Sequence, residues 1–102
     1  MNETNCNMLY FDRMAVARLS GIFEDQGTWF ADYKLEDQLS ESIYAFIRFN
    51  CEHLSEGSFD DHALLQFAEF LNADKWSVLK HGVPCKITSA PLFRETDLSW
   101  VE

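Results

Sequence analysis

The sequence predicts an α+β fold, in which an antiparallel sheet carries two central helices on one face. Hairpin-like stretches in the first and last thirds of the chain predict the sheet, and two segments with helical periodicity lie between them. The expected order is therefore two strands, two helices and three strands. The 102 residues are 47% hydrophobic and 25% charged, which is typical of one globular domain spanning 1–102.

Residues 14–35 are expected to form the N-terminal hairpin. A two-residue loop at 26–27 would mix apolar and charged side chains on both faces, whereas a three-residue loop at 25–27 separates them. We therefore predict the three-residue loop, with its glycine in the left-handed conformation of a glycine bulge. In this register Ile22 and Phe30 face each other on the polar side of the hairpin. The predicted pairs are Leu19–Tyr33, Gly21–Ala31 and Phe23–Trp29 on the apolar face, and Arg18–Lys34, Ser20–Asp32, Ile22–Phe30 and Glu24–Thr28 on the other.

Two amphipathic helices are expected in the centre of the chain. Residues 38–56 carry apolar side chains at three- and four-residue spacing, and Gly57 supplies a stop signal. A second helix is expected to begin at Ser58 or Asp60, which can cap it, and to end near Asn72. The predicted buried positions are Leu39, Ile43, Phe46, Ile47 and Leu54 in the first helix, and Leu64, Phe67, Ala68 and Leu71 in the second.

Three strands are expected in the last third of the chain. A two-residue turn at 81–82 places Val78 opposite Cys85 in a hairpin. Pro84 has no N–H to donate, so it is expected at a sheet edge or at a position outside the hydrogen-bond ladder. The predicted strands are 76–80, 83–88 and 98–101.

Acidic side chains are concentrated in the middle of the chain. The net charge is −9, and residues 24–61 contain ten carboxylates against only Lys34 and Arg48. Such a surface opposes direct nucleic-acid binding, which needs Lys and Arg, and it complements a basic protein surface. The alternative is that the acidity only keeps the protein in solution. The candidate partner-binding residues are Glu24, Asp25, Asp32, Glu36, Asp37 and Glu41, together with an apolar spot formed by Ile22 and Phe30.

No motif for catalysis or cofactor binding is found. The sequence contains no phosphate loop, dinucleotide fingerprint, metalloprotease motif or nucleophile elbow, so no cofactor is predicted and an enzyme is not expected. Cys51, His53 and His62 are the one group that resembles metal ligands. The first two would point about 200° apart on a helix, so no metal site is predicted.

Asn50 is the polar residue with two open interpretations. It lies within the apolar stripe of the first predicted helix, between Phe46 and Leu54. A buried amide needs partners at both ends, so Asn50 is expected to make a structural hydrogen bond to a neighbouring loop or strand. The alternative is that Asn50 and His53 line a pocket together with aromatic side chains such as Tyr33 and Trp76.

The expected location is the cytoplasm. The three cysteines are odd in number and widely spaced, and neither a signal peptide nor a membrane-spanning segment is predicted. The first functional hypothesis is a small acidic module that binds a basic protein, of the inhibitor or immunity type by analogy of charge and size alone. The alternatives are a ligand-binding domain or small enzyme with the pocket near Asn50, and a subunit that forms a homodimer through an edge strand or the Ile22–Phe30 face.

Overall fold

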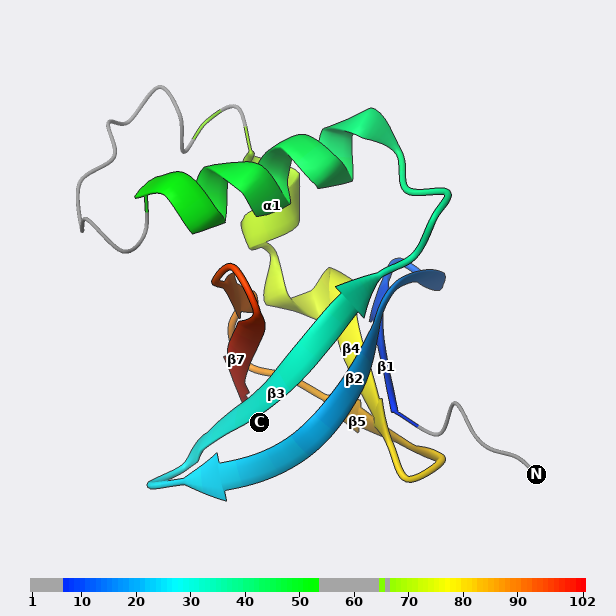
Figure 1. The fold of residues 1–102 in the computed structure, drawn as a ribbon, viewed down its shortest axis with the longest axis vertical. Helices are drawn as coiled ribbons and strands as arrows, with labels where there is room; N and C mark the ends of the chain where they lie inside the picture. Colours follow the sequence, from blue (N-terminus) through cyan, green and yellow to red (C-terminus); the bar gives the residue numbers. More distant parts are fainter. Residues whose placement is uncertain (1–6, 54–64, 66) are drawn as a thin grey trace.

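The computed structural model describes residues 7–53, 65 and 67–102, which form a small α+β fold. Seven strands make one antiparallel sheet in the order β5-β4-β1-β2-β3-β7-β6 (Figure 1). Within the described ranges there is one α-helix, α1 (Glu41–His53), and two 3-10 helices, η2 (Ala68–Leu71) and η3 (Ala73–Lys75). The strands are β1 (Met8–Phe11), β2 (Met14–Asp25), β3 (Thr28–Leu35), β4 (Trp76–Lys80), β5 (Val83–Lys86), β6 (Leu92–Phe93) and β7 (Asp97–Val101).

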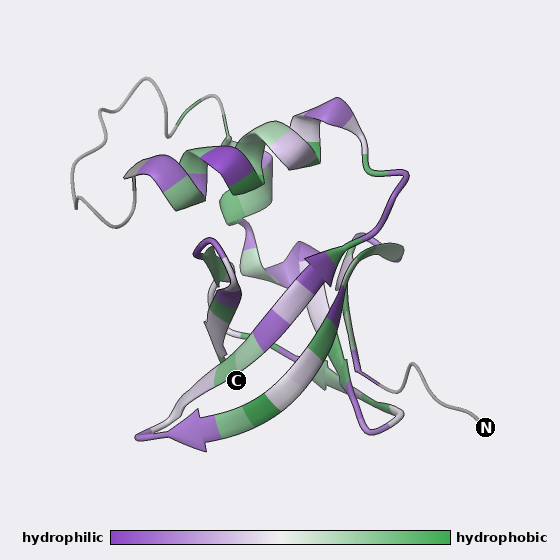
Figure 2. Cartoon of the chain, viewed as in Figure 1, coloured by the Kyte–Doolittle hydropathy of each residue, from purple (hydrophilic) through white to green (hydrophobic). Residues whose placement is uncertain are grey.

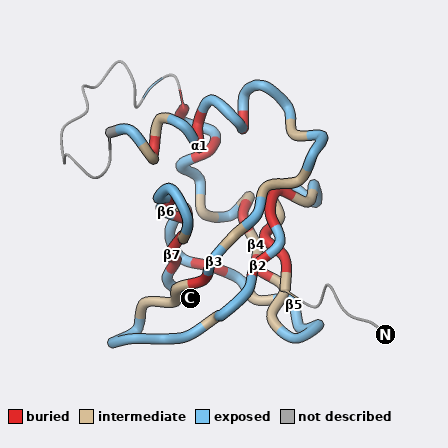
Figure 3. Tube along the Cα trace, viewed as in Figure 1, coloured by how far each residue is buried: buried red, intermediate tan, exposed pale blue. Residues whose placement is uncertain are grey.

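The sheet curls so far that its two ends meet around a common core. Trp76 on β4 and Phe93 on β6 have ring centroids 6.1 Å apart, although these strands are second and last in the sheet order. Beyond β5, the backbone N–H of Thr88 donates to the carbonyl of Val101 on β7 at 2.7 Å. Helix α1 lies across one end of this curve, and its Phe46 contacts both Trp76 and Phe93 (Figure 1). The core is therefore enclosed by the concave face and α1, and buried residues lie along both (Figure 3).

The β2–β3 hairpin confirms the predicted register at its base and contradicts it at its tip. Nearer the tip, Phe23 pairs with Phe30, and the turn contains two residues, 26–27, both with positive φ. The predicted three-residue loop is therefore wrong. A bulge takes up the difference, because residues 21–22 together lie opposite Ala31 alone. The pairs found as predicted are Arg18–Lys34, Leu19–Tyr33 and Ser20–Asp32.

This bulge reverses the faces of the residues that follow it in β2. Gly21 adopts φ +62°, the left-handed conformation of the first residue in a glycine-type bulge. As a result Ile22 turns inward and packs against the core, while Phe23 turns outward and stacks on Phe30. The expected outward pair of Ile22 and Phe30 is therefore wrong, and Phe23 takes the place of Ile22.

Helix α1 begins later than the predicted residue 38. It starts at Glu41 because the Ser40 hydroxyl accepts a hydrogen bond from the N–H of Ile43 at 3.3 Å, as an N-cap does. Ile43, Phe46 and Ile47 are buried as predicted. Residues 54–56, the predicted last part of this helix, lie outside the described residues.

The second predicted helix is not confirmed. Its expected beginning, 58–64, lies outside the described residues. The part that is described ends in η2, where Phe67 and Phe70 are buried and Leu71 is exposed. A 3-10 helix has three residues per turn, so it places 67 and 70 on one side, whereas α-helical periodicity predicted 67 and 71.

The register of the C-terminal hairpin is confirmed, but its second strand ends at Lys86 and not at the predicted residue 88. Val78 lies opposite Cys85, and the turn at 81–82 has positive φ at both residues. Pro84 lies in β5, which is an edge strand, and a sheet edge was one of the two positions predicted for it. The last strand, β7, has Leu98 and Trp100 buried.

Two strands, β1 and β6, were not predicted. β1 is only four residues long, and it joins β2 through a turn at Asp12 and Arg13, both with positive φ. Neither residue is glycine, so the sequence carries no strong turn signal at this point. β1 nevertheless pairs with both β2 and β4, so it connects the N-terminal and C-terminal parts of the sheet.

Candidate functional site

The six acidic candidates divide into groups at opposite ends of the β2–β3 hairpin. Glu24 and Asp25 end β2 beside the turn, whereas Glu36, Asp37 and Glu41 follow the far end of β3. The eight residues of β3 separate these groups by about 26 Å at 3.3 Å per residue. Hydrophilic colouring accordingly appears at the hairpin tip and again between β3 and α1 (Figure 2). The sixth candidate, Asp32, lies along β3, so the six carboxylates do not form one cluster.

The group after β3 is partly neutralised. Glu36 accepts a hydrogen bond from Arg18 Nε at 3.1 Å, which forms an ion pair. Arg18, Lys34, Glu36 and Asp37 line an open cavity of about 470 Å³ together with Met14, Ala15, Leu35 and Gln38. Charges of both signs meet in this cavity, so it provides no purely acidic surface for a cationic partner.

Exposed apolar side chains lie along the convex face of the sheet near the hairpin tip, on both sides of Ser99, which is 6% exposed. Directly opposed residues in a sheet project to the same face, so the Phe23–Phe30, Phe30–Ser99 and Ser99–Leu92 pairs form a row across four strands. Val101 pairs with Thr28 in the next row. The exposed fractions are 57% for Phe23, 50% for Leu92 and 38% for Val101, and Phe30 is half-buried. We call Phe23, Phe30, Leu92 and Val101 the convex stripe.

Carboxylates lie on both sides of the convex stripe. Asp25 pairs with Thr28 on the side nearer the turn, and Asp32 pairs with Asp97 on the other side. Arg94 is bound to Asp97, with Nε 3.5 Å from Oδ1, and its guanidinium carbon is 5.9 Å from the centre of the Phe30 ring. Among the described residues, neither Asp25 nor Asp32 has an ion-pair partner. The stripe is therefore an apolar surface bordered by the Arg94–Asp97 ion pair and by two carboxylates that have no ion-pair partner in the described part of the chain.

A second site is an apolar cavity of about 330 Å³ between α1 and the 88–92 segment. Its lining includes Asn50, which is 2% exposed. Asn50 Nδ2 donates to the carbonyl of Phe46 at 3.0 Å, and Oδ1 accepts from the N–H of Phe93 at 3.4 Å. Asn50 thus both ties α1 to β6 and lines a cavity. The cavity is lined by Phe46, Phe49, Asn50, Leu71, Ala73, Thr88, Ser89, Ala90, Pro91 and Leu92.

Two of the other residues expected at this pocket, Tyr33 and Trp76, do not line it. Trp76 Nε1 donates to the carbonyl of Phe70 at 2.7 Å within the core. The Tyr33 hydroxyl donates to the carbonyl of Arg94 at 2.6 Å and lies 3.8 Å from Cys51 Sγ. Burial, followed by the contact with Cys51, raises the pKa of the Tyr33 phenol well above its usual value of about 10. The side chain of His53 lies outside the described residues.

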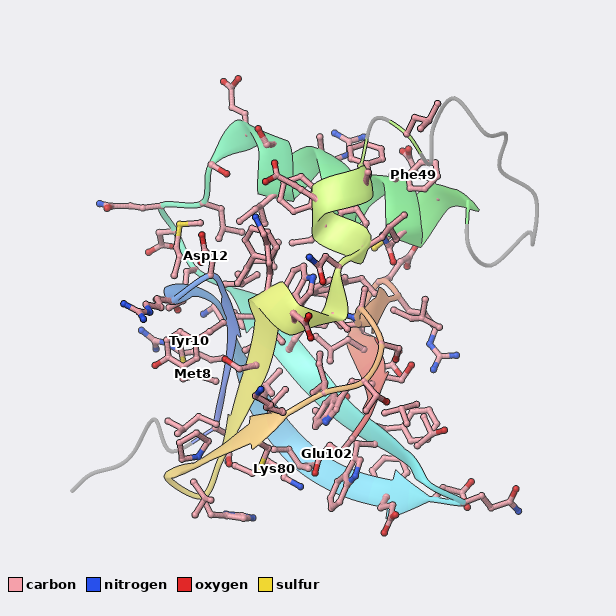
Figure 4. All side chains as sticks on the ribbon, turned by 180° about the vertical axis from the view of Figure 1, so that it is seen from behind. Met8, Tyr10, Asp12, Phe49, Lys80 and Glu102 are labelled. Atoms are coloured by element: carbon pink, nitrogen blue, oxygen red, sulfur yellow. The ribbon has the colours of Figure 1, made fainter. Side chains whose placement is uncertain are left out.

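A lysine over a tryptophan ring lies at the end of the curved sheet away from α1, and no local sequence pattern predicts it. Lys80 Nζ is 3.4 Å from the centre of a Trp29 ring and 2.7 Å from Glu102 Oε2. Trp100 stacks on Trp29 and donates from Nε1 to the same Glu102 oxygen at 3.0 Å. Lys80 and Glu102 lie together in Figure 4. They are 22 residues apart, and only the curl of the sheet brings them into contact.

No group of three or more potential metal ligands occurs among residues 7–53, 65 and 67–102. No helix in this part of the chain is long and apolar enough to cross a bilayer.

Comparison with known proteins assigns no family to this chain. The chain matches no known family model, and neither the curated proteins nor the solved structures with which it was compared show significant similarity to it.

Proposed function

We propose that this protein is a small binding module that engages a basic protein through the convex stripe and the carboxylates beside it. The observation that carries the proposal is the stacked pair of Phe23 and Phe30 on the outer face of the sheet. Their ring centroids are 5.2 Å apart with 18° between the planes, and Phe23 remains 57% exposed. Aromatic side chains are the usual anchors of protein interfaces.

The exposure of Phe23 is costly for an isolated protein. Complete burial of a Phe side chain is worth about 1.5–3 kcal/mol, and an uninterrupted hairpin ladder would have turned Phe23 inward. The bulge at Gly21 instead turns Ile22 inward and leaves the larger side chain of Phe23 in water. A partner that covers the convex stripe would recover this free energy on binding.

The charges beside the convex stripe indicate the chemistry of the partner. Asp25 and Asp32 border the apolar residues without ion-pair partners among the described residues, and the whole chain carries a charge of −9. A partner with apolar side chains surrounded by Lys and Arg would be attracted from a distance and would pair with these carboxylates. Two copies of this chain would bring like charges together, which disfavours a homodimer through the same face. A cytoplasmic inhibitor of a basic protein, including the immunity type, fits this description.

Photo-crosslinking from two exposed aromatic positions tests the proposal. A photoreactive phenylalanine derivative replaces Phe23 in one version of the protein and Tyr44, which is 48% exposed on α1, in the other. In the native host, position 23 should crosslink a discrete basic protein, and position 44 should not. Asp25→Lys should reduce the yield at position 23 several-fold, whereas Asp37→Lys at the opposite end of the hairpin should not.

Three results would overturn the proposal. They are the absence of any crosslink from position 23, the same products from positions 23 and 44, and an acidic protein as the species captured at position 23. A crosslink to a second copy of this chain would instead support the homodimer. Circular dichroism of each version checks that the sheet is intact before crosslinking.

A further inference from the structure

We propose that the 330 Å³ cavity beside Asn50 binds a small uncharged molecule, an apolar ring or branched chain that carries one hydrogen-bond acceptor. The cavity shares Leu92 with the convex stripe but does not include the Phe23–Phe30 pair, and the inference does not depend on the proposed partner. A volume near 300 Å³ is at the lower end of the range for small-molecule sites, which are mostly apolar with a few polar groups.

The walls of the cavity come from parts of the chain that are far apart in sequence. Phe46 and Phe49 belong to α1, Leu71 is the last residue of η2, and residues 88–92 form the opposite side of the cavity. Within that segment Pro91 is fully buried, so the backbone there is held against the core. The cavity is thus formed by packed elements on two sides.

The ligand is expected to be uncharged, because the described residues that line the cavity include no charged side chain. A charged group transferred there would lose its hydration without gaining an ion-pair partner. Aromatic and aliphatic lining residues favour an apolar body instead, through burial of apolar area and ring contacts. This lining distinguishes the site from the open, charged cavity beside Arg18.

The hydrogen bonds of the Asn50 side chain indicate why the ligand should carry an acceptor. A side-chain amide has two N–H groups, and one of them donates to the carbonyl of Phe46. For the second N–H, the described part of the chain supplies no acceptor, although Asn50 is 2% exposed. Buried N–H groups are nearly always satisfied, so a carbonyl or ether oxygen on a bound molecule would complete the bonding of this amide.

Three probes of similar size test the chemistry of the site. Acetophenone has a ring and one acceptor, isopropylbenzene has the same number of heavy atoms without the acceptor, and benzoate adds a charge. Titrations of the ¹⁵N-labelled protein should show acetophenone binding about three- to tenfold tighter than isopropylbenzene, the usual value of one neutral hydrogen bond. Benzoate should bind at least about tenfold more weakly than acetophenone. The side-chain amide of Asn50 and the backbone of residues 88–92 should shift.

Cavity-filling variants localise the binding. Ala90→Leu and Ala73→Leu each add volume at the lining, and either one, if folded by circular dichroism, should weaken acetophenone binding about tenfold or more. Phe23→Ser is the matched control, because Phe23 lies on the convex face. It should leave acetophenone binding unchanged. Lack of acetophenone binding, equal affinity for isopropylbenzene, or full binding by both folded filling variants would overturn the inference and would leave the proposed partner unaffected.

Discussion

The bulge in β2 depends on Gly21, and replacing this residue by alanine tests it directly. Gly21 has φ +62°, a left-handed conformation that glycine adopts freely and that other residues avoid. A Cβ added at this position would meet Asp32 Oδ2 at 3.8 Å, which is ordinary van der Waals contact. The cost of Gly21→Ala is therefore backbone strain and not a steric clash.

The size of that cost follows from the conformation. An L-residue in the left-handed region is less stable by about 1–2 kcal/mol, so Gly21→Ala should lower the free energy of unfolding by that amount. Gly21→Asn should cost less, since Asn tolerates this region better than other non-glycine residues. For a chain of about 100 residues, 1 kcal/mol corresponds to a decrease of about 4–8 °C in Tm.

Urea unfolding monitored by tryptophan fluorescence measures both variants. Gly82→Ala provides the matched control, because Gly82 has φ +82° in the 81–82 turn and no heavy atom within 4 Å of an added Cβ. Its loss of stability sets the scale for left-handed strain outside the bulge. If Gly82→Ala is destabilised and Gly21→Ala is as stable as the wild type, Gly21 does not adopt the left-handed conformation and the bulge assignment is wrong.

Substitutions at four other positions test other parts of the structure. The raised pKa of Tyr33 keeps its phenol protonated in the folded state, so stability is complete below about pH 10 and falls as the pH rises further. Tyr33→Phe should reduce this alkaline loss of unfolding free energy, measured by urea unfolding at several pH values. Lys80→Met removes the contacts with Trp29 and Glu102 and should cost about 1–2 kcal/mol by the same assay; an unchanged value would contradict the cluster. Ser40→Ala removes the N-cap of α1 and should cost about 1 kcal/mol, whereas Ser40→Asp should restore the stability. Phe23→Thr should lower the unfolding free energy by no more than about 1.5 kcal/mol, because the side chain is mostly in water and loses only its stacking on Phe30; a larger loss would place Phe23 in the core.

The parts of the fold that were predicted correctly are those with strong local signals. Alternation of apolar and polar residues fixed the base of the β2–β3 hairpin, and the His81-Gly82 turn fixed the β4–β5 register. Three- and four-residue spacing identified Ile43, Phe46 and Ile47 as buried. Each of these features depends on neighbours within a few residues, so it can be read from a short window of sequence.

The features that were missed depend on contacts between distant residues. β1 is four residues long and is held by β2 and β4 on its two sides, so tertiary pairing determines it more than its own propensity. Lys80 and Glu102 meet only because the sheet curls. A pocket at Asn50 was one of the predicted alternatives, but its other lining residues were not predicted, since α1 and residues 88–92 come together only in the folded chain.

The error at the hairpin tip concerns the same residues as the proposed interface. The sequence rule that separates apolar from polar faces chose the register that buries Phe23, and that choice is correct as far as Ser20. The structure departs from the rule at Gly21, where the backbone can adopt positive φ without strain. If the bulge served only to bend the sheet, a polar residue at position 23 would serve equally well and would avoid an exposed aromatic ring. A departure from the local pattern that leaves Phe23 stacked on Phe30 in water therefore favours selection for binding at this face.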